Sequence, residues 1–355
     1  MAGAQMAGAQ MADAARVTQA RPAIMTVEHL TTGFRRESGS VTVVDDVSFA
    51  LEKGAVLGIV GESGSGKSML LRSLMRILPA TASTTAGAVL YSDQDLLALP
   101  LSAMPAIRGA EIAMVFQDPT SALNPVYTIR RQLYGALASH RTLSRQELEK
   151  RSIRALSDVG IPSAAERLDE YPHQFSGGMA QRVVIAIALA SDPKILLADE
   201  PTTALDVTTQ RQILMLLLDI QRARHMTLVL VSHSLGVIAQ MCDRVAVMYA
   251  GQLVEMATTD TLFREPRHPY TVGLLSCVPD AHGPRGARLA PIPGVVPDPG
   301  DLPPGCRFAP RCPLAIEACT SGPIAMERAG PDHLTRCIRP QDVSRTAGLF
   351  VAGAA

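Results

Sequence analysis

Short apolar runs alternate with amphipathic stretches between about residues 24 and 265 of the chain. Four of the runs are short, apolar and β-rich, as buried parallel strands are. They cover 55–60 (AVLGIV), 111–116 (EIAMVF), 194–199 (KILLAD) and 227–232 (TLVLVS). Strands that alternate with helical patterns indicate a sheet covered by helices, so this part of the chain predicts an α/β domain.

The pattern changes in two places within this domain. "RVAVMYAGQLVEMA" at 244–257 alternates around Ala250 and Gly251, and it predicts a hairpin that closes the sheet. Between Asp118 and Pro193 the chain contains polar, helix-periodic segments such as "SRQELEKRSIRALSDVG", which predict a helical insert.

Proline and glycine become frequent after residue 265 and culminate in "PIPGVVPDPGDLPPGC" at 291–306. Proline fixes φ and removes a backbone donor, so this stretch cannot form regular helix or sheet. We therefore expect a C-terminal module made mostly of loops. Such a module buries little core and needs a stabilising cross-link.

Composition narrows the possible functions. The 355 residues allow one large domain with an appended module, or two domains of ordinary size. The 33 basic and 33 acidic side chains cancel, so no overall basic field draws the protein to nucleic acid. The longest apolar runs, 183–190 and 214–218, are far shorter than the roughly 20 residues of a bilayer-spanning helix. We expect no membrane span in this chain.

The first residues and the cysteines indicate whether the protein occupies an oxidising or a reducing cellular compartment. "MAGAQMAGAQMADAARVTQA" repeats MAGAQ and lacks the basic and apolar regions of a secretory signal, so we expect residues 1–22 to form a disordered leader. Without a route to an oxidising compartment the thiols should stay reduced. Clustered cysteines then favour metal ligation over disulfides.

A phosphate-binding motif, "GESGSGKS" at 61–68, follows a predicted strand and precedes the helical "MLLRSLMRIL". In that context the backbone N–H groups and the helix N-terminus face a phosphate. We expect Lys67 to reach the β- and γ-phosphates of a nucleotide and Ser68 to ligate Mg²⁺. A glycine-rich turn without a nucleotide is the alternative.

Two adjacent carboxylates end the predicted strand in "KILLADEP" at 194–201. At the carboxyl end of a strand beside a phosphate loop, Asp199 can hold Mg²⁺ and Glu200 can orient and polarise the attacking water. Such a pair is also common in solvated loops, so its occurrence together with residues 61–68 is what makes the motif specific.

A second anion-binding arrangement lies in "FSGGMAQRV" at 175–183. Ser176 and the two glycines before a helix start offer a hydroxyl and backbone N–H groups to a phosphate. An ATPase that works alone does not need two phosphate sites. We therefore expect the second site to complete the ATP pocket of a partner subunit.

With these motifs the sequence closely resembles the ATP-binding subunits of ABC transporters. The matching segments in chain order are "GESGSGKS" (Walker A), "MVFQD" (Q-loop), "FSGGMAQRV" (signature), "ILLADEP" (Walker B), "TTALD" (D-loop) and "LVSHSL" (switch histidine). "QDPTSALNP" at 117–125, "RHPYTVGLLSCVP" at 267–279 and "PGCRFAPRCPLA" narrow the resemblance to the oligopeptide/dipeptide importers, a group that also serves nickel and glutathione uptake. The resemblance covers about residues 24–340.

The resemblance implies the fold class and the domains. It implies an α/β P-loop ABC ATPase with a RecA-like core, an antiparallel β subdomain and a helical subdomain, plus a loop-rich C-terminal cysteine module. The nucleotide-binding domain would span 23–265, with its helical subdomain at about 118–190. The C-terminal module with a four-cysteine cluster would span 266–345.

The resemblance also implies roles for single residues in a head-to-tail pair of ATPase subunits. ATP would be cradled in cis by Gly61, Ser63, Gly64, Ser65, Gly66, Lys67 and Ser68, and the partner's ATP contacted by Ser176, Gly177 and Gly178. The residues implied to be catalytic are Glu200, Gln117 and His233, and those implied to hold Mg²⁺ are Ser68, Gln117 and Asp199. Gln117 would also link the site to the membrane subunits, and His233 would contact the γ-phosphate. Asp206 would act across the dimer, and Phe34 is the candidate for stacking on adenine, with burial as its alternative.

The sequence departs from the subgroup's pattern at two positions. Ala180 stands in the signature where a basic residue is usual, which is expected to weaken a contact near the phosphate. Ser234 follows the switch histidine where an acidic residue often stands, which puts a carboxylate role there in doubt. The chain also holds one ATPase domain, so the resemblance implies a second, homologous ATPase as partner.

The C-terminal cysteines follow the spacing C-x5-C-x6-C-x17-C, formed by Cys306, Cys312, Cys319 and Cys337. Zinc sites usually contain a tight C-x2–4-C pair, which is missing here. Four thiolates on long loops also suit a [4Fe–4S] cluster, and similar tails of peptide-importer ATPases are associated with one. We expect a [4Fe–4S] cluster, with zinc or another metal and unligated thiols as alternatives. Cys242 and Cys277 lie in apolar contexts and predict core positions.

The resemblance therefore implies an ATP-hydrolysing, energy-coupling subunit of a di- or oligopeptide importer, with ATP and Mg²⁺ as cofactors. The implied partners are two transmembrane permease subunits, a homologous ATPase and an extracytoplasmic peptide-binding protein. The implied location is the cytoplasmic face of the inner membrane. Nickel and glutathione are alternative cargoes. A non-transport ABC ATPase acting on ribosomes or DNA is disfavoured, because tandem ATPase domains and long coiled coils are missing from the sequence.

Overall fold

The structure is a computed structural model that describes residues 21–36, 39–203, 205–277 and 291–343. The leader expected at residues 1–22 lies outside the described residues, except for its last two. Within the described ranges, every helix is too short or too polar to cross a membrane.

The regular elements agree with the apolar pattern of the sequence. The strands are β1 (Ala23–Arg36), β2 (Gly39–Glu52), β3 (Val56–Val60), β4 (Ala82–Tyr91), β5 (Gln94–Asp95), β6 (Ile112–Val115), β7 (Ile195–Asp199), β8 (Thr227–Val231), β9 (Arg244–Tyr249), β10 (Gln252–Thr258), β11 (Glu327–Gly330) and β12 (His333–Thr335). The helices are α2 (Lys67–Leu74), α3 (Pro119–Ala122), α4 (Ile129–Ala138), α5 (Arg145–Asp158), α6 (Ala164–Arg167), α7 (Gly177–Leu189), α8 (Val207–Arg224), α9 (Leu235–Met241), α10 (Thr259–Arg264) and α11 (Pro269–Ser276). The four predicted apolar runs form β3, β6, β7 and β8.

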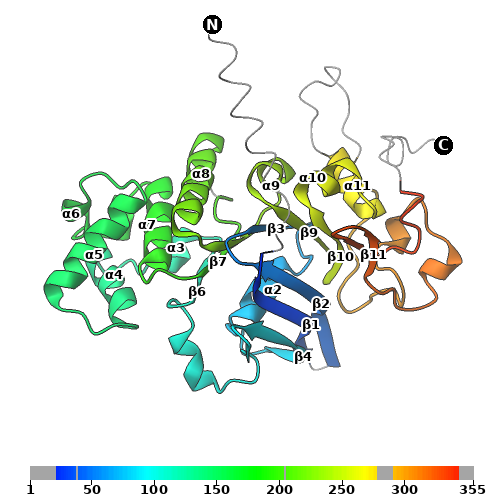
Figure 1. The fold of residues 1–355 in the computed structure, drawn as a ribbon, viewed down its shortest axis with the longest axis horizontal. Helices are drawn as coiled ribbons and strands as arrows, with labels where there is room; N and C mark the ends of the chain where they lie inside the picture. The colour runs from blue at the N-terminus through cyan, green and yellow to red at the C-terminus, as the bar shows by residue number, and fades with distance from the viewer. Residues whose placement is uncertain (1–20, 37–38, 204, 278–290, 344–355) are drawn as a thin grey trace, which may run out of the picture.

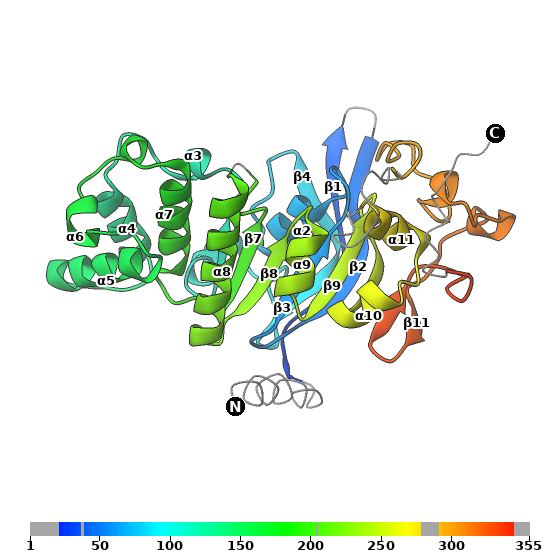
Figure 2. The same cartoon turned by 90° about the horizontal axis from the view of Figure 1, so that it is seen from above.

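The strands form two sheets. The main sheet has the order β11-β12-β10-β9-β3-β8-β7-β6, and the smaller one has the order β2-β1-β4-β5. From β9 to β6 neighbouring strands are parallel, whereas every pair in the smaller sheet is antiparallel. The smaller sheet and α2 lie on one side of the main sheet (Figure 1), and α8, α9 and α10 cover the other (Figure 2). The α/β fold with an antiparallel β subdomain is thus confirmed.

The central strands are buried on both faces. Leu57 and Ile59 of β3 pack into the core shared with α2 and the smaller sheet, while Val56 and Val60 belong to the larger core under α7, α8 and α9. Successive side chains of a strand face opposite sides of a sheet, so a strand covered on both sides needs a continuous apolar run. This burial is why the strands could be predicted from the sequence.

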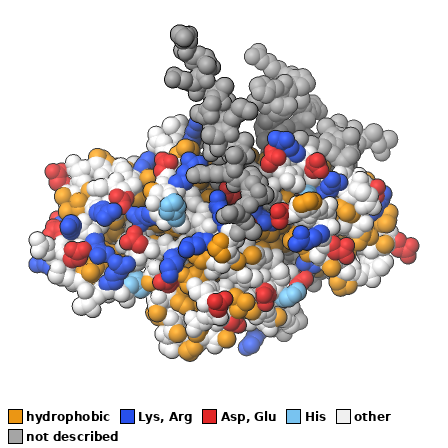
Figure 3. Space-filling model, viewed as in Figure 1, with side chains coloured by type: hydrophobic (Ala, Val, Ile, Leu, Met, Phe, Trp, Pro, Cys, Tyr) orange, Lys and Arg blue, Asp and Glu red, His pale blue; other side chains and the backbone are white. Residues whose placement is uncertain are grey.

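The segment between β6 and β7 forms the predicted helical insert, α3 to α7. Thr128, Ser144 and Ser176 begin three of its helices, and each side chain accepts a hydrogen bond from the backbone N–H three residues further on. Such caps satisfy donors that the start of a helix leaves without partners. The insert lies at one end of the molecule, with acidic and basic side chains interspersed on its surface (Figures 1 and 3).

The C-terminal segment is mostly loops, as predicted, but it also extends the main sheet. The hairpin predicted at 244–257 forms as β9 and β10. It does not close the sheet, because β12 pairs with β10 through Glu255–Thr335 and Met256–Leu334. The prediction was wrong here because β11 and β12 contain only four and three residues, too few for a readable alternation.

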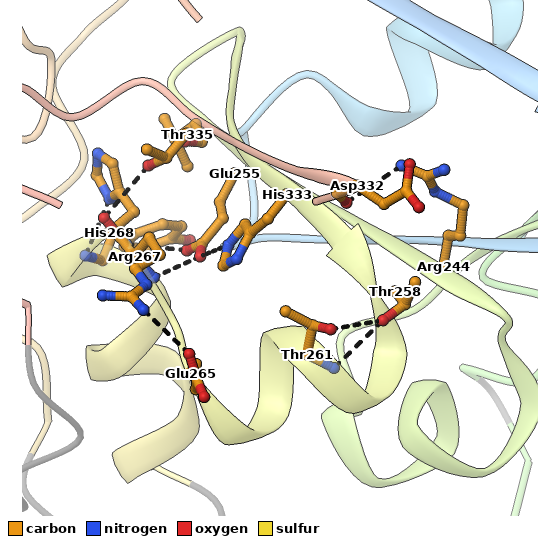
Figure 4. A network of polar contacts seen from close by, with 12 residues as sticks. Arg244, Glu255, Thr258, Thr261, Glu265, Arg267, His268, Asp332, His333 and Thr335 are labelled. Carbon is orange, nitrogen blue, oxygen red and sulfur yellow. Dashed lines mark hydrogen bonds and ion pairs between the residues drawn. The ribbon is translucent and has the colours of Figure 1, made fainter. Parts of the chain in front are cut away.

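A buried carboxylate joins this segment to the main sheet (Figure 4). Glu255 of β10 is 0% exposed and accepts hydrogen bonds from the backbone N–H groups of Arg267 at 2.5 Å and His268 at 3.0 Å. Its Oε1 also lies 2.7 Å from Nε2 of His333, on β12. Burying a carboxylate is unfavourable unless such partners surround it, so Glu255 fixes both β12 and the start of α11 to β10.

Aromatic packing anchors the loops of the C-terminal segment. Phe308 is 1% exposed, and its ring centroid lies 5.3 Å from that of Tyr249 and 5.4 Å from that of Tyr270. Phe308 and Ile292 belong to the same core as the main sheet. The segment buries few apolar side chains, as expected, but most of those that it buries share the core of the main sheet. It docks by apolar packing onto the domain that precedes it.

Candidate active site

The loop Gly61–Gly66 connects β3 to α2, as the phosphate-binding motif predicts. A Cβ atom on Gly61 would lie 2.2 Å from the carbonyl oxygen of Met248, and one on Gly66 would lie 2.4 Å from that of Val43. The φ angles of Gly61 and Gly66 are 154° and 96°. Only glycine fits both this space and this backbone, so the loop keeps its shape through two close backbone contacts.

Lys67 begins α2 and is 6% exposed. Its Nζ donates hydrogen bonds to the carbonyl oxygens of Gly61 at 2.8 Å and Glu62 at 2.9 Å. Burial lowers the pKa of Lys67, while the carboxylates of Glu200, Asp199 and Glu62 oppose that shift. An ammonium folded onto carbonyl groups of its own loop can exchange them for the oxygens of a phosphate.

Ser68 and Asp199 meet where β3 and β7 end at the same edge of the sheet. The Ser68 hydroxyl donates a hydrogen bond of 2.9 Å to Oδ1 of Asp199, which is 2% exposed. Burial raises the pKa of Asp199, the hydrogen bond from Ser68 lowers it, and the nearby Glu200 raises it further. A hydroxyl next to a carboxylate is an oxygen donor set that fits Mg²⁺.

Glu200 follows β7 with a φ of 45°, a left-handed backbone that is uncommon outside glycine and concentrates at functional sites. Its Oε2 accepts hydrogen bonds from the Thr203 hydroxyl at 2.9 Å and from Nε2 of Gln117 at 3.2 Å. Nδ1 of His233 lies 3.6 Å from the same oxygen. Groups from three loops thus surround one carboxylate oxygen.

These side chains line one cavity of about 390 Å³ at the edge of the main sheet. Its lining residues are Val43, Gly61, Ser63, Gly64, Ser65, Gly66, Lys67, Ser68, Met69, Gln117, Glu200 and His233. The structure therefore brings together every residue predicted to bind ATP in cis from the loop and all three predicted catalytic residues. Asp199 lies behind the cavity, hydrogen-bonded to Ser68.

The signature residues and Asp206 lie outside this cavity. Ser176 caps α7, and both Ser176 and Gly177 are exposed, while Gly178 packs against α8. Asp206 is also exposed and caps α8. Hydrogen bonds to its carboxylate, above all from Thr209, hold the pKa of Asp206 below its usual value. These groups stand at the N-termini of two adjacent helices, where they can meet a ligand that the cavity itself does not hold.

Phe34 does not reach the cavity either. It lies on β1 opposite Val41 and Ala82, and it is partly buried. Of the two positions that depart from the subgroup's pattern, Ala180 is 7% exposed within the larger core, and Ser234 caps α9. Both of these side chains support the fold around the site.

The sequence analysis missed Val43 and Met69, which line the cavity, and Thr203, which contacts Glu200. The Thr203 hydroxyl donates a hydrogen bond to the Glu200 carboxylate, three positions earlier in "EPTT". A separation of three residues is typical of a turn, so the sequence could have indicated this contact. Val43 lines the cavity from β2 of the smaller sheet, and its carbonyl group approaches Gly66. That contact depends on how the two sheets pack, so it leaves no local pattern.

The four C-terminal cysteines line a second, small cavity of about 20 Å³, formed by Cys306, Cys312, Cys319, Cys337 and mostly apolar neighbours. This volume is room for about one water molecule. Burial raises the pKa of Cys312 to about 12 and that of Cys337 to about 11, and it also raises the pKa of Cys306. The protonated thiol is therefore the favoured form of these three side chains at neutral pH.

The expected [4Fe–4S] cluster gains no support from the arrangement of these side chains. In the part of the chain that the structure describes, no group of three or more His, Cys, Asp or Glu side chains is placed to hold a metal ion. The chemistry of the donor set does fit such a cluster, because four cysteine sulfurs line the same cavity. Cys242 is buried beside Gly58, as predicted, and Cys277 is partly buried against the larger core.

Comparison with known proteins agrees with this geometry. Residues 44–203 match the family model described as ABC transporter, and residues 254–319 match the one described as oligopeptide/dipeptide transporter, C-terminal region. The dipeptide transport ATP-binding protein DppD of Bacillus subtilis is 50% identical over 297 residues, which cover 83% of this chain and 88% of DppD. A Brucella abortus protein provisionally named a peptide import ATP-binding protein is 50% identical over 314 residues, covering 88% of this chain and 94% of that protein.

A solved structure shows the same architecture. The ATP-binding cassette MJ0796, a dimer in a post-hydrolysis state bound to ADP and Pi, has a TM-score of 0.60 and 27% sequence identity to this chain. The match covers 66% of this chain and 98% of MJ0796. The fold and the cavity thus define an ATP-binding cassette, an α/β ATPase with a P-loop.

The chain belongs to the ABC transporter family, within the group that carries the oligopeptide/dipeptide transporter C-terminal region. The resemblance seen in the sequence motifs is confirmed.

Replacing Gly66 with alanine tests the close backbone approach at the phosphate loop. The new Cβ would meet the Val43 carbonyl group at 2.4 Å and the φ of 96° would be strained, so we expect ATP binding to be lost. Gly135→Ala, in α4, is the matched control, because a Cβ there meets nothing within 4 Å. That variant should bind ATP normally and gain about 0.5–1 kcal/mol of stability. Binding of a fluorescent ATP analogue and thermal unfolding measure both effects, and normal binding by Gly66→Ala would contradict the account of the loop.

Proposed function

We propose that the chain is the ATP-hydrolysing, energy-coupling subunit of an importer for dipeptides or oligopeptides. The observation that carries the proposal is the cavity that gathers the phosphate loop, Gln117, Glu200 and His233 at one edge of the sheet. Peptides are favoured as cargo because residues 254–319 match the C-terminal region of oligopeptide/dipeptide transporters, and because DppD is named for dipeptide transport.

ATP binding is assigned to the loop Gly61–Ser68. The backbone N–H groups of the loop and the N-terminus of α2 would face the phosphates. Lys67 would leave the carbonyl groups of its own loop for the β- and γ-phosphates, to which a lysine at this position is suited. Phe34, partly buried on β1, remains the candidate for stacking on the adenine ring.

Mg²⁺ would be held by Ser68, Asp199 and Gln117, whose oxygen atoms suit a hard cation. When bound, the cation neutralises negative charge on the phosphates. The protein's contribution is to hold the Asp199 carboxylate in place, which the hydrogen bond from Ser68 accomplishes.

Glu200 is assigned as the general base. It would accept a proton from the attacking water as that water adds to the γ-phosphorus and the bond to the β-phosphate oxygen breaks, which yields ADP and phosphate. The hydrogen bonds from Thr203 and Gln117 orient the carboxylate before the substrate arrives. His233, beside the same oxygen, is assigned to contact the γ-phosphate.

A second ATPase subunit would complete the site. Ser176 and Gly177 are exposed at the N-terminus of α7, with Gly178 following them, so these residues are available to ATP that a partner holds. Asp206, exposed at the start of α8, is assigned to act across the same interface. MJ0796 is described as a dimer. For this chain we propose a distinct but homologous ATPase as the partner.

The remaining partners follow from the importer assignment. They are two transmembrane permease subunits and an extracytoplasmic peptide-binding protein. This subunit would lie at the cytoplasmic face of the inner membrane, and nucleic acid would not be among its ligands. Gln117 lies where β6 leads into the helical insert, and we assign to it the coupling of the ATP site to the permeases. Nickel and glutathione remain the alternative cargoes.

We also propose that Cys306, Cys312, Cys319 and Cys337 are the ligands of one metal centre, a [4Fe–4S] cluster with zinc as the alternative. The chemistry of the donor set is what supports this proposal, because four sulfurs are ligands that both centres accept. Ligation would require the thiols to lose their protons, so metal uptake should become more favourable as the pH rises.

Analysis of iron, sulfide and zinc in protein purified without oxygen tests the metal centre. We expect about four irons and four sulfides per chain and a visible absorption band, both lost in a Cys306→Ser/Cys312→Ser variant. Cys242→Ser is the control, because Cys242 lies in the core away from the cysteine cavity, and it should keep the full metal content. Stoichiometric zinc would establish the alternative, and protein without metal would contradict the proposal.

Glu200→Gln tests the assigned function. The amide cannot accept a proton from water, so ATP hydrolysis by the complex reconstituted with its permeases should fall by about 10²–10⁴. Uptake of a labelled dipeptide should fall with it, while ATP binding is retained. Glu265→Gln is the control, because this carboxylate is exposed and pairs with Arg267 away from the cavity. Normal turnover by Glu200→Gln would refute the role of Glu200, and uptake of nickel or glutathione in place of peptides would correct the cargo.

A further inference from the structure

Two arginines in the C-terminal segment reach the phosphate loop and its surroundings. Arg307 and Arg311 lie between Cys306 and Cys312, in a run of short turns that ends in the 3-10 helix Ala309–Arg311. Their side chains are only 10% and 5% exposed. A buried guanidinium group needs partners for its donors, and the carboxylates that pair with these two, Asp45 and Glu62, lie on the nucleotide-binding part of the chain.

Arg311 forms a paired contact with Glu62, the second residue of the phosphate loop. Nη1 donates to Oε2 of Glu62 at 2.7 Å, and Nη2 donates to Oε1 at 3.1 Å. Nε donates to the carbonyl oxygen of Pro293 at 2.7 Å, and Nη2 also reaches that of Ile292 at 3.3 Å. Two parallel hydrogen bonds between a guanidinium and a carboxylate are a strong and directional form of ion pair. The contact therefore fixes both the distance and the orientation of the Glu62 side chain.

The backbone of Glu62 is held as well. Its N–H group donates a 2.8 Å hydrogen bond to the hydroxyl of Tyr270, which lies on α11 and is 0% exposed. Its carbonyl group accepts from Nζ of Lys67 at 2.9 Å and from the N–H of Ser65 at 3.2 Å. Glu62 thus lies between the C-terminal segment on one side and Lys67 on the other, and a shift of its peptide group would move a partner of the lysine.

Arg307 supports the turn behind the loop. It donates to the carbonyl oxygen of Ala250 at 2.5 Å and pairs with Asp45 of β2. The next residue in that turn, Gly251, donates a 3.0 Å hydrogen bond to the carbonyl group of Ser65. The C-terminal segment therefore supports the phosphate loop at two separate points.

Glu62 does not line the ATP cavity, although its neighbours Gly61 and Ser63 do. Its carboxylate is bonded to Arg311, on the opposite side of the loop. A side chain in this place acts on the nucleotide indirectly, by setting the conformation of the loop and through its charge near Lys67.

We propose that Arg311 is a positioning residue for ATP binding. Through Glu62 it holds the phosphate loop in the conformation that receives the nucleotide, so ATP affinity depends on the contact between Arg311 and Glu62 rather than on the docking of the segment in general. The proposal rests on the assignment of ATP binding to Gly61–Ser68, and it holds whether or not the cysteines bind a metal. Because the contact lies within one chain, it acts before any partner subunit binds.

Four variants of the full-length chain test this role: Arg311→Met, Glu62→Gln, the double variant, and Arg311→Lys, which keeps the charge but loses the paired geometry. We expect each single variant to bind a fluorescent ATP analogue about tenfold more weakly, the scale of one charge-assisted contact. The double variant should bind no more weakly than Arg311→Met, because both changes break the same contact. In the reconstituted complex KM for ATP should rise while kcat changes little, a split that loss of stability alone would not produce.

Arg336→Met is the matched control. Arg336 is another buried arginine of the same segment, and it donates to the carbonyl group of Leu253 and pairs with Asp46, away from the phosphate loop. This variant should lower the melting temperature but leave ATP affinity within about twofold of the unaltered chain, as expected for a site outside the contact.

The outcomes distinguish the proposal from the function on which it rests. Unchanged ATP affinity in both Arg311→Met and Glu62→Gln would overturn the role of Arg311. Equal weakening in Arg311→Met and Arg336→Met would also overturn it, because the effect would then come from undocking of the whole segment. An unaltered chain that binds no ATP would instead overturn the assignment of the ATP site.

Discussion

The close approach of backbone segments at the two ends of the phosphate loop is the constraint on which the rest of the site depends. The carbonyl groups of Val43 and Met248 leave no room for a side chain at Gly66 and Gly61. The loop is therefore fixed against β2 on one side and β9 on the other. From that fixed point α2 presents Lys67 and Ser68, and β7, two strands away, delivers Asp199 to the hydroxyl of Ser68. The chemistry of the site follows from where these strands end.

The sequence predicted the parts of the structure that are determined locally. The central strands are buried on both faces, so they appear as continuous apolar runs, and the phosphate loop carries its glycines where backbone groups approach. The motifs predict Lys67 and Glu200, the family resemblance implies Gln117 and His233, and all four line one cavity in the structure. The contact of Thr203 with Glu200 was missed, although the two residues are only three positions apart.

What the sequence could not reveal is how the C-terminal segment docks. In the pairing of β12 with β10, β12 is too short to show a period, and one partner of the buried Glu255, His333, lies 78 positions further along the chain. The contact between Glu62 and Arg311 spans 249 positions and leaves no local pattern. The cysteine spacing identified which side chains meet, but it could not determine how their sulfur atoms are arranged. Long-range packing decides each of these features. It makes a segment that buries few apolar side chains into a support for the phosphate loop.

Calorimetric titration of MgATP into the full-length chain, beside Lys67→Ala, tests the central claim most directly. The account predicts saturable binding of one ATP per chain by the unaltered protein. It also predicts a loss of affinity of at least about tenfold in the variant, since a charged hydrogen-bonding partner of the phosphates is removed. The melting temperature of the variant without nucleotide confirms that it is folded. Equal affinity of the two proteins for ATP would contradict the account, because the cavity at the end of β3 would then not be the nucleotide site.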